Sequence, residues 1–291
     1  MAQFGQALLG GVTTGSIYAL VGIGLVMIFK MSRVLNLAQG EFLILGALFA
    51  YTLVGLLPLW LACLLAVVGT FVIGLLFERL AVRPVRGSTL TVLLVITLGT
   101  SILLKGAAML IWGKEPMSLP SLSGNNPLQV AGLFIPPQGL WILGGIAVTG
   151  LILRLFFDRT LLGKAMVATA ENPTAAGMTG INTIRLGRLA FGLSGAIGGL
   201  AGVLIAPLTF ISYDGGTLIG LKGFVAAALG GMYSIPGAVA GGLLLGALEA
   251  LGAGYVSSIF KDVTAFVVLI VLLVVRSGLD KRKTLLEEGL S

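Results

Sequence analysis

The feature that most constrains this chain is a series of apolar stretches that leaves little sequence outside them. An untilted helix needs about 20 apolar residues to cross a bilayer, and eight stretches come close to that length or exceed it. They lie at about 7–29, 35–57, 59–77, 90–112, 139–157, 188–211, 236–256 and 262–276, and a shorter one lies at 222–233. We therefore expect an all-α polytopic transmembrane helix bundle of about 8–9 segments, some of them broken or re-entrant.

The basic residues predict how this bundle is oriented. If the loops at 30–33, 78–88, 154–188 and 276–291 face the cytoplasm, they hold 14 of the 18 Lys and Arg residues, and the opposite side holds only Lys114, Lys222 and Lys261. By the positive-inside rule, the N-terminus is then outside and the C-terminus cytoplasmic. Trp60, Trp112 and Trp141 would all lie at the outer boundary, where an aromatic belt is expected.

Several kinds of chemistry are excluded by what the sequence lacks. There is no His and a single cysteine, Cys63, so His-based catalysis, His metal ligation and intramolecular disulfides are ruled out. No P-loop motif occurs, so ATP cannot bind by that device. The net charge of +7 does not indicate nucleic-acid binding, because the basic residues sort by side of the membrane. We expect no catalytic residue, metal or cofactor.

Polar residues inside the apolar stretches are candidates for a solute pathway, because they are expensive in a membrane. Asn36, Gln39 and Glu41 do not share one helical face, so we expect a broken segment whose polar groups face a cavity or neighbouring backbone; capping of helix ends is the alternative. Glu249 lies deep in a span and has to be protonated, paired or exposed to water. Lys105 is expected to reach the outer headgroups by snorkelling.

Two further patterns concern how the helices pack. Glycines four residues apart occupy one helix face and predict close helix contacts rather than ligand contacts; they are Gly195/Gly199, Gly198/Gly202, Gly237/Gly241 and Gly242/Gly246. The stretch at 222–233 is too short for a straight span and is followed by Pro236, which indicates a broken or re-entrant helix or, alternatively, two short packed helices.

The longest polar interruption, residues 158–188, predicts a structured loop. Gly163 to Glu171 is expected to form one short helix, and Asn172 caps a second one that begins at Pro173. Gly177 and Gly180 are candidate left-handed stop positions. The helix Pro173 to Met178 would then present Ala175, Ala176 and Met178 to a groove on another protein; an ordinary surface loop is the alternative.

Taken together, these residues favour a pathway for a small neutral or zwitterionic solute. Intramembrane ionisable groups are too sparse for a proton or sodium relay, and no ring of charge indicates an ion filter. A stand-alone secondary carrier or channel and a membrane scaffold without transport activity are the rival classes. An intramembrane enzyme is disfavoured because no nucleophile and base are paired.

Five segments of this sequence resemble the permeases of bacterial branched-chain amino acid ABC importers. They are residues 33–42 (RVLNLAQGEF), 78–87 (ERLAVRPVRG), 180–182 (GIN), 229–238 (LGGMYSIPGA) and 241–246 (GGLLLG). The resemblance extends from about residue 7 to 276, and the length is similar to that of the H-type subunit. It implies one transmembrane permease domain, residues 1–291, in the bacterial inner membrane.

The resemblance also implies partners and residue roles. The expected partners are a second homologous permease, two cytoplasmic ABC ATPases and a periplasmic substrate-binding protein. The loop 158–188 would be the coupling element that docks in the ATPase, through Glu171, Asn172, Pro173, Ala175, Ala176, Gly177, Gly180 and Ile181. Asn36, Gln39, Glu41 and Glu249 remain the pathway candidates. Branched-chain amino acids are the implied substrates, with other small amino acids or amides such as urea as the alternative.

Overall fold

The computed structural model describes residues 2–124, 126–130, 132–255, 262–272 and 274. The basic segment 276–291 and Lys261, both used above to predict the orientation, lie outside the described residues.

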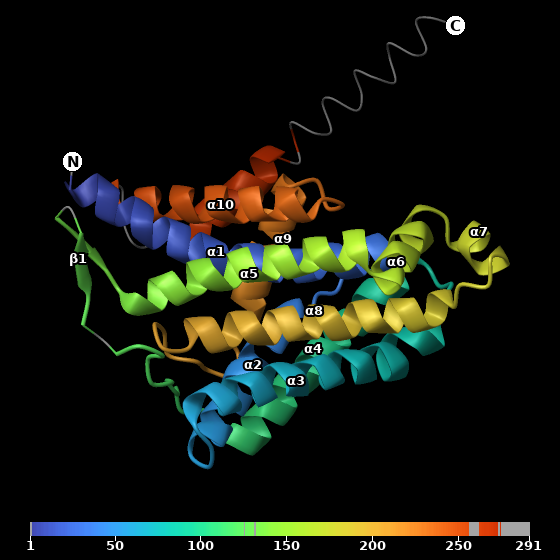
Figure 1. Ribbon diagram of the computed structural model, residues 1–291, viewed down its shortest axis with the longest axis horizontal. Coiled ribbons are helices and arrows are strands. Elements are labelled where there is room, and N and C mark those ends of the chain that lie inside the picture. The colour runs from blue at the N-terminus through green and yellow to red at the C-terminus, as the bar shows by residue number, and fades with distance from the viewer. Residues whose placement is uncertain (1, 125, 131, 256–261, 273, 275–291) are drawn as a thin grey trace, which may run out of the picture.

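The described chain is a bundle of helices (Figure 1). In chain order the helices are α1 (Ala2–Ser32), α2 (Gln39–Val54), α3 (Leu59–Phe77), the π-helix η1 (Glu78–Val82), the 3-10 helix η2 (Arg83–Val85), α4 (Leu90–Trp112), α5 (Pro137–Arg159), α6 (Leu161–Glu171), α7 (Pro173–Met178), α8 (Thr183–Ile205), α9 (Gly216–Leu229) and α10 (Ile235–Tyr255). A further apolar helix spans Asp262–Leu272.

Six of these helices are long and apolar enough to cross a membrane, namely α1, α3, α4, α5, α8 and α10. The prediction of an all-α polytopic bundle is therefore confirmed. The other apolar helices of the described chain are shorter: α2 has 16 residues and α9 has 14. At a rise of 1.5 Å per residue they are about 24 and 21 Å long, less than the hydrocarbon core of about 30 Å. The predicted nine crossings thus include helices that do not span alone.

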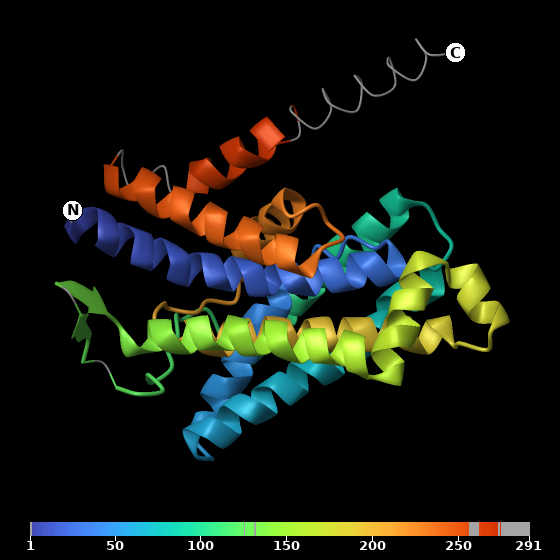
Figure 2. The same ribbon diagram turned by 45° about the horizontal axis from the view of Figure 1, so that its top comes forward.

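The long helices lie side by side, and the two ends of the bundle differ (Figures 1 and 2). At one end, called here the hairpin end, α1 begins beside strands β1 (Leu128–Val130) and β2 (Leu133–Ile135), which pair antiparallel. The Gln6 side chain holds this hairpin through hydrogen bonds of 2.8 and 3.0 Å with the Phe134 backbone. At the other end, called here the α7 end, α6 and α7 project from the bundle.

Close helix contacts occur at the glycines that the sequence singled out. A Cβ atom on Gly246 of α10 would overlap the backbone of Gly11 and Gly15 in α1, and one on Gly202 of α8 would overlap the Leu43 carbonyl of α2. The same holds for the other members of the four predicted pairs, each of which approaches atoms outside its own helix. The predicted role of these glycines in packing is confirmed. Because they lack a side chain, α1 and α8 lie in close contact with their neighbours.

The chain between α1 and α2 is not helical, as the scattered polar residues predicted. Arg33 has φ +57°, and the backbone then runs extended past α4, where the Thr97 hydroxyl lies 3.2 Å from Leu35 O and accepts from Leu37 N at 3.4 Å. These hydrogen bonds satisfy the backbone N–H of Leu37 and the backbone carbonyl of Leu35, which lipid could not do. The Gln39 amide donates to the carbonyl of Ser194, the middle residue of α8, at 3.2 Å. Helix α2 therefore begins about halfway through the bundle.

Helix α9 begins at the same depth as α2. A Cβ on Gly216, the first residue of α9, would lie 2.7 Å from the carbonyl oxygen of Gly40. The predicted short stretch at 222–233 is thus part of a helix that starts earlier, and the predicted span at 188–211 is the helix α8, which ends at Ile205.

The turn between α9 and α10 lies at the α7 end, against the end of α1. Gly231 and Met232 have φ values of +90° and +62°, so the chain reverses through two left-handed residues. The guanidinium of Arg33 lies 4.8 Å from the centre of the Tyr233 ring and contacts its hydroxyl. The predicted break before Pro236 is therefore a turn. The Arg33–Tyr233 contact holds this turn against the non-helical segment that follows α1.

Segment 78–87 continues α3 first in the wider coil of the π-helix η1 and then in the tighter coil of the 3-10 helix η2. Glu78 is fully buried and pairs with Arg86 at 3.0 Å, which holds η1 and η2 to each other. A Cβ on Gly187, near the start of α8, would overlap the Arg86 guanidinium. The ion pair therefore packs directly against α8.

Candidate functional site

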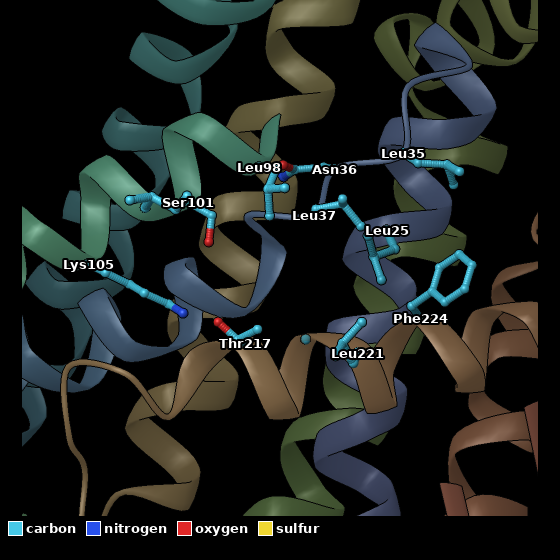
Figure 3. Close-up of a pocket in the computed structure, with 12 residues that line it drawn as sticks. Leu25, Leu35, Asn36, Leu37, Leu98, Ser101, Lys105, Thr217, Leu221 and Phe224 are labelled. Atoms are coloured by element: carbon cyan, nitrogen blue, oxygen red, sulfur yellow. The ribbon is translucent and has the colours of Figure 1, made fainter. Parts of the chain in front are cut away.

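A cavity of about 210 Å³ lies where α2 and α9 begin, between α1, α4 and α9 (Figure 3). Its polar lining is Asn36, Ser101, Lys105 and Thr217. Its apolar lining includes Leu25, Leu98, Ile102, Leu221 and Phe224. The cavity therefore combines a few polar groups with an aliphatic and aromatic wall, which is the usual composition of a small-molecule site.

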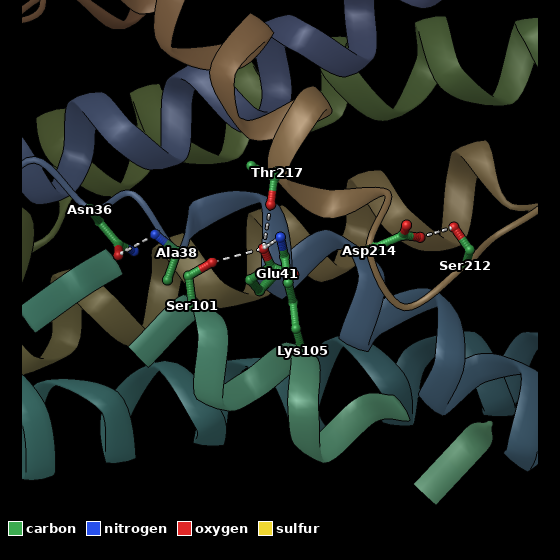
Figure 4. Close-up of polar contacts among 8 residues, drawn as sticks. All are labelled: Asn36, Ala38, Glu41, Ser101, Lys105, Ser212, Asp214 and Thr217. Atoms are coloured by element: carbon green, nitrogen blue, oxygen red, sulfur yellow. Dashed lines mark hydrogen bonds and ion pairs between the residues drawn. The ribbon is translucent and has the colours of Figure 1, made fainter. Parts of the chain in front are cut away.

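Glu41 lies directly behind this cavity and is 2% exposed. Its Oε1 accepts hydrogen bonds from Ser101 Oγ at 2.9 Å and from Thr217 Oγ1 at 3.2 Å, and Lys105 Nζ is 3.8 Å away (Figure 4). The carboxylate sits in the first turn of α2 and meets the first turn of α9, where the exposed backbone N–H dipoles favour negative charge. The structure thus holds a buried carboxyl group at the meeting point of two helix N-termini.

The sequence predicts that Lys105 reaches the outer headgroups by snorkelling. In the structure its side chain does not extend toward them. Its side chain is 25% exposed and lies on the same face of α4 as Ser101, one turn away, pointing at Glu41. A buried carboxylate is expensive unless a cation or hydrogen-bond donors satisfy it, which explains why the lysine turns inward.

Asn36 and Gln39 are both buried but differ in position. Asn36 lines the cavity, and its Oδ1 accepts from Ala38 N at 3.1 Å. Gln39 faces α8, where Ser194 Oγ lies 2.7 Å from its Oε1. The structure therefore brings Asn36 and Glu41 to one cavity, while Gln39 joins α2 to α8.

Glu249 belongs to a different cluster, between α1, α9 and α10. It is 1% exposed and pairs with Lys222 at 2.9 Å, and its Oε2 accepts from Tyr18 at 2.8 Å. Lys222 also contacts Asp262 at 2.8 Å. Lys222, which the charge pattern assigns to the side opposite the cytoplasm, is 3% exposed within α9. Of the three states expected for Glu249, the structure shows the paired one.

The helices of the polar loop form as the sequence predicted, with two corrections. Asn172 Oδ1 accepts from Ala175 N at 3.0 Å and caps α7. Gly180 has φ +84° and ends α7, and Ile181 N donates to Ala176 O at 3.1 Å, as in a Schellman motif. Gly177 is not a left-handed stop but lies within α7.

The second correction concerns which side chains α7 presents. Ala176 is 4% exposed and packs inward, so it is not part of the presented face. Met178 and Leu161 are 84% and 87% exposed at the α7 end. A helix six residues long with a cap at each end thus carries a large exposed apolar side chain away from the bundle.

A larger hollow of about 730 Å³ lies between α5 and α10, but it is a weaker candidate. Its wall is apolar except for Arg154 and Asp158, which are both exposed and lie 3.7 Å apart, one turn apart on α5. With no buried polar group to orient a solute, this hollow resembles a crevice on the outside of the bundle.

Three polar residues of the cavity were not predicted as site residues: Ser101, Lys105 and Thr217. A signal for the first two was available, because Ser101 and Lys105 are four residues apart in an otherwise apolar stretch and so share a helix face. Thr217 carries no such signal. Its position depends on where α9 begins.

Comparison with known proteins gives consistent matches. Residues 7–275 match the family model described as the permease component of the branched-chain amino acid transport system. The chain is 36% identical over 294 residues to the high-affinity branched-chain amino acid transport system permease protein LivH of Escherichia coli K12, with 95% of each chain covered. It is 36% identical to BraD of Pseudomonas aeruginosa, described in the same words, with 93% of each covered.

A solved structure shares the fold at low sequence identity. A chain of PsaBC from Streptococcus pneumoniae, solved in complex with Fab, aligns with a TM-score of 0.50 and 15% identity, covering 94% of this chain and 91% of that one.

Proposed function

The chain belongs to the permease components of branched-chain amino acid transport systems, and from this premise we propose that it carries leucine, isoleucine and valine into the cell. It is a membrane-spanning permease subunit of an ABC importer. The observation that carries the substrate proposal is the identity of 36% over 95% of the chain to a permease described as a branched-chain amino acid transporter.

The partners in this proposal are a second homologous permease, two ABC ATPases and a substrate-binding protein. The absence of a P-loop in this chain supports ATP hydrolysis by other subunits. The chain would form one transmembrane permease domain over residues 1–291, in the inner membrane of a bacterium. Basic residues such as Arg79 and Arg83, which directly follow α3, and Arg159, which ends α5, support a cytoplasmic position for the α7 end and an outside position for the N-terminus.

Helix α7 is the proposed docking element for the ATPase. The Asn172 cap and the Gly180 turn fix its two ends, and Met178 is exposed at its tip. A large apolar side chain held outside the bundle on a rigid helix suits insertion into a groove on a partner. Closure of the ATPases would move α7, and α6 and α8 would transmit the movement to the bundle.

The pathway proposed for the solute follows the cavity at the start of α2 and α9. Asn36 lines it and Glu41 lies behind it, which supports a pathway role for both. Gln39 and Glu249 are bonded inside the bundle, which supports a role in holding the walls of the path in place.

The test is uptake of labelled L-leucine by cells whose only branched-chain importer contains this chain. A Cβ on Gly177 would meet no atom within 4 Å, so Gly177→Ala is expected to transport normally and Gly177→Trp to insert but not transport. The bulky ring would occupy the space that the ATPase groove needs. Normal uptake by a correctly inserted Gly177→Trp variant would refute the docking role, and no uptake by the wild type would refute the substrate.

A further inference from the structure

Lys105 lines the cavity at the start of α2 and α9, and Glu41, 2% exposed, lies directly behind the cavity wall and faces the lysine without a close hydrogen bond. Lys105 Nζ and Glu41 Oε1 are 3.8 Å apart, whereas a charge-assisted N–H···O hydrogen bond measures about 2.7–2.9 Å. The lysine lines the cavity, and Figure 3 shows its ammonium pointing toward Thr217. The lysine ammonium is therefore able to form a shorter hydrogen bond with a ligand in the cavity than it forms with Glu41.

The acidic group is fixed in position. Ser101 and Thr217 both donate to Oε1, from α4 and α9, and both side chains line the cavity. Neither these two bonds nor the lysine contact involves Oε2. Glu41 is thus held by two hydroxyls through Oε1, and its Oε2 lies close to Gly216 at the start of α9.

The charge balance of the cavity selects among ligands. A ligand with a single charge would leave one charge of the Lys105 and Glu41 pair uncompensated in a low-dielectric region, which is costly. A zwitterion brings one charge of each sign and leaves the total at zero. Both groups can then exchange their loose mutual contact for a close contact with the ligand.

The remaining wall and the size of the cavity suit an aliphatic amino acid. Leu25, Leu98, Leu221 and Phe224 form an apolar surface beside the charged pair. The volume of about 210 Å³ is smaller than the roughly 300–1,000 Å³ of pockets that take drug-sized ligands, so the cavity suits a small solute.

We propose that this cavity binds the amino acid zwitterion during transport, with Lys105 binding its carboxylate, Glu41 its ammonium group, and the apolar wall its side chain. This inference rests on the proposed function, because it identifies where the transported amino acid is held. It gives Lys105 a direct role in recognition that the sequence did not indicate.

The experiment measures ligand protection of a cysteine at the cavity in the purified transporter complex. The only native cysteine is removed by Cys63→Ala, and Leu98→Cys places a thiol on the cavity wall. Alkylation of this chain by N-ethylmaleimide is followed by mass spectrometry with L-leucine, 3-methylbutylamine or 4-methylpentanoate present. A cysteine at the exposed Ser118, outside the cavity, is the labelling control.

L-Leucine is expected to slow alkylation of Leu98→Cys but not of Ser118→Cys. The two analogues each lack one charged group, so each should need at least about tenfold higher concentrations for the same protection. Adding Lys105→Met should weaken protection by L-leucine to a similar degree, and Lys105→Arg should restore part of it. Lys114→Met, at an exposed lysine, should stay within about twofold of the parent, as surface substitutions do.

Equal protection by L-leucine and both analogues, or full protection in the Lys105→Met variant, would overturn the proposal. If Leu98→Cys does not assemble, Ile102→Cys gives the same measurement from the neighbouring turn of α4 without changing a donor to Glu41. Uptake of L-leucine is measured with the same variants. Uptake without protection overturns this site but not the proposed function, whereas absence of uptake by the wild-type complex overturns the proposed function itself.

Discussion

Removing the ammonium of Lys222 should destabilise the chain more than removing any surface charge. Lys222→Met leaves Glu249, which is 1% exposed, without the cation that lies 2.9 Å away. Breaking a buried ion pair by removing one partner costs about 3–5 kcal/mol. The Tyr18 hydroxyl still donates to Glu249 at 2.8 Å, so we expect a loss near the lower limit, about 3 kcal/mol. Asp262 is 54% exposed at its side chain and should contribute little.

A double-mutant cycle separates the ion pair from the packing around it. Glu249→Gln keeps the shape of the side chain and the Tyr18 bond but removes the charge. The variant with both changes should therefore lose less stability than the two single variants added together, with a coupling free energy of about 1–3 kcal/mol. The exposed Lys114→Met serves as the matched control and should change the free energy of unfolding by no more than about 0.5 kcal/mol.

The free energy of unfolding is measured on the chain in detergent micelles by SDS titration, followed through the fluorescence of Trp60, Trp112 and Trp141. A Lys222→Met variant as stable as Lys114→Met would refute the reasoning. Strict additivity of the two single variants would show that Lys222 and Glu249 do not stabilise each other.

Three other predictions follow from single contacts. Asn172→Ala removes the cap of α7 and should weaken that helix by about 0.5–2 kcal/mol, seen as faster amide hydrogen exchange over α7 with exchange in the bundle unchanged; equal protection would contradict the cap. Gly246→Ala forces a methyl group into the α1 backbone and should cost about 1–3 kcal/mol in the same SDS titration, whereas Gly10→Ala meets open space and should not destabilise; equal effects would contradict the packing. Glu41→Gln should lower L-leucine uptake without loss of assembly, and wild-type transport kinetics would return Glu41 to a purely structural role.

Much of the fold follows from local sequence. Apolar length predicts the long helices, and Asn172 followed by Pro173 predicts the start of α7 to the residue. The scattered polar residues after Val34 predict the break before α2. Each of these features is determined by residues close to it in sequence. The cap at Asn172 sets the start of α7, and the need to satisfy backbone groups inside the membrane sets the long helices and the break before α2.

Other features depend on contacts between segments that are distant in sequence. Lys222 has the charge typical of a loop, and only the approach of α10 and Tyr18 makes its burial favourable. Lys105 turns inward because Glu41, from another helix, needs a cation. Gly177 and Gly180 are equal candidates for a helix stop by composition, and the position of the Ile181 hydrogen bond decides between them.

Affinity purification of this chain from native membranes in mild detergent, with mass spectrometry of the bound proteins, tests the central claim most directly. The account predicts recovery of a second permease and P-loop ATPases, and it predicts that Gly177→Trp loses the ATPases but keeps the second permease, because only α7 is blocked. Recovery of the chain alone, still folded and moving solute in vesicles without ATP, would contradict the account and establish a stand-alone carrier.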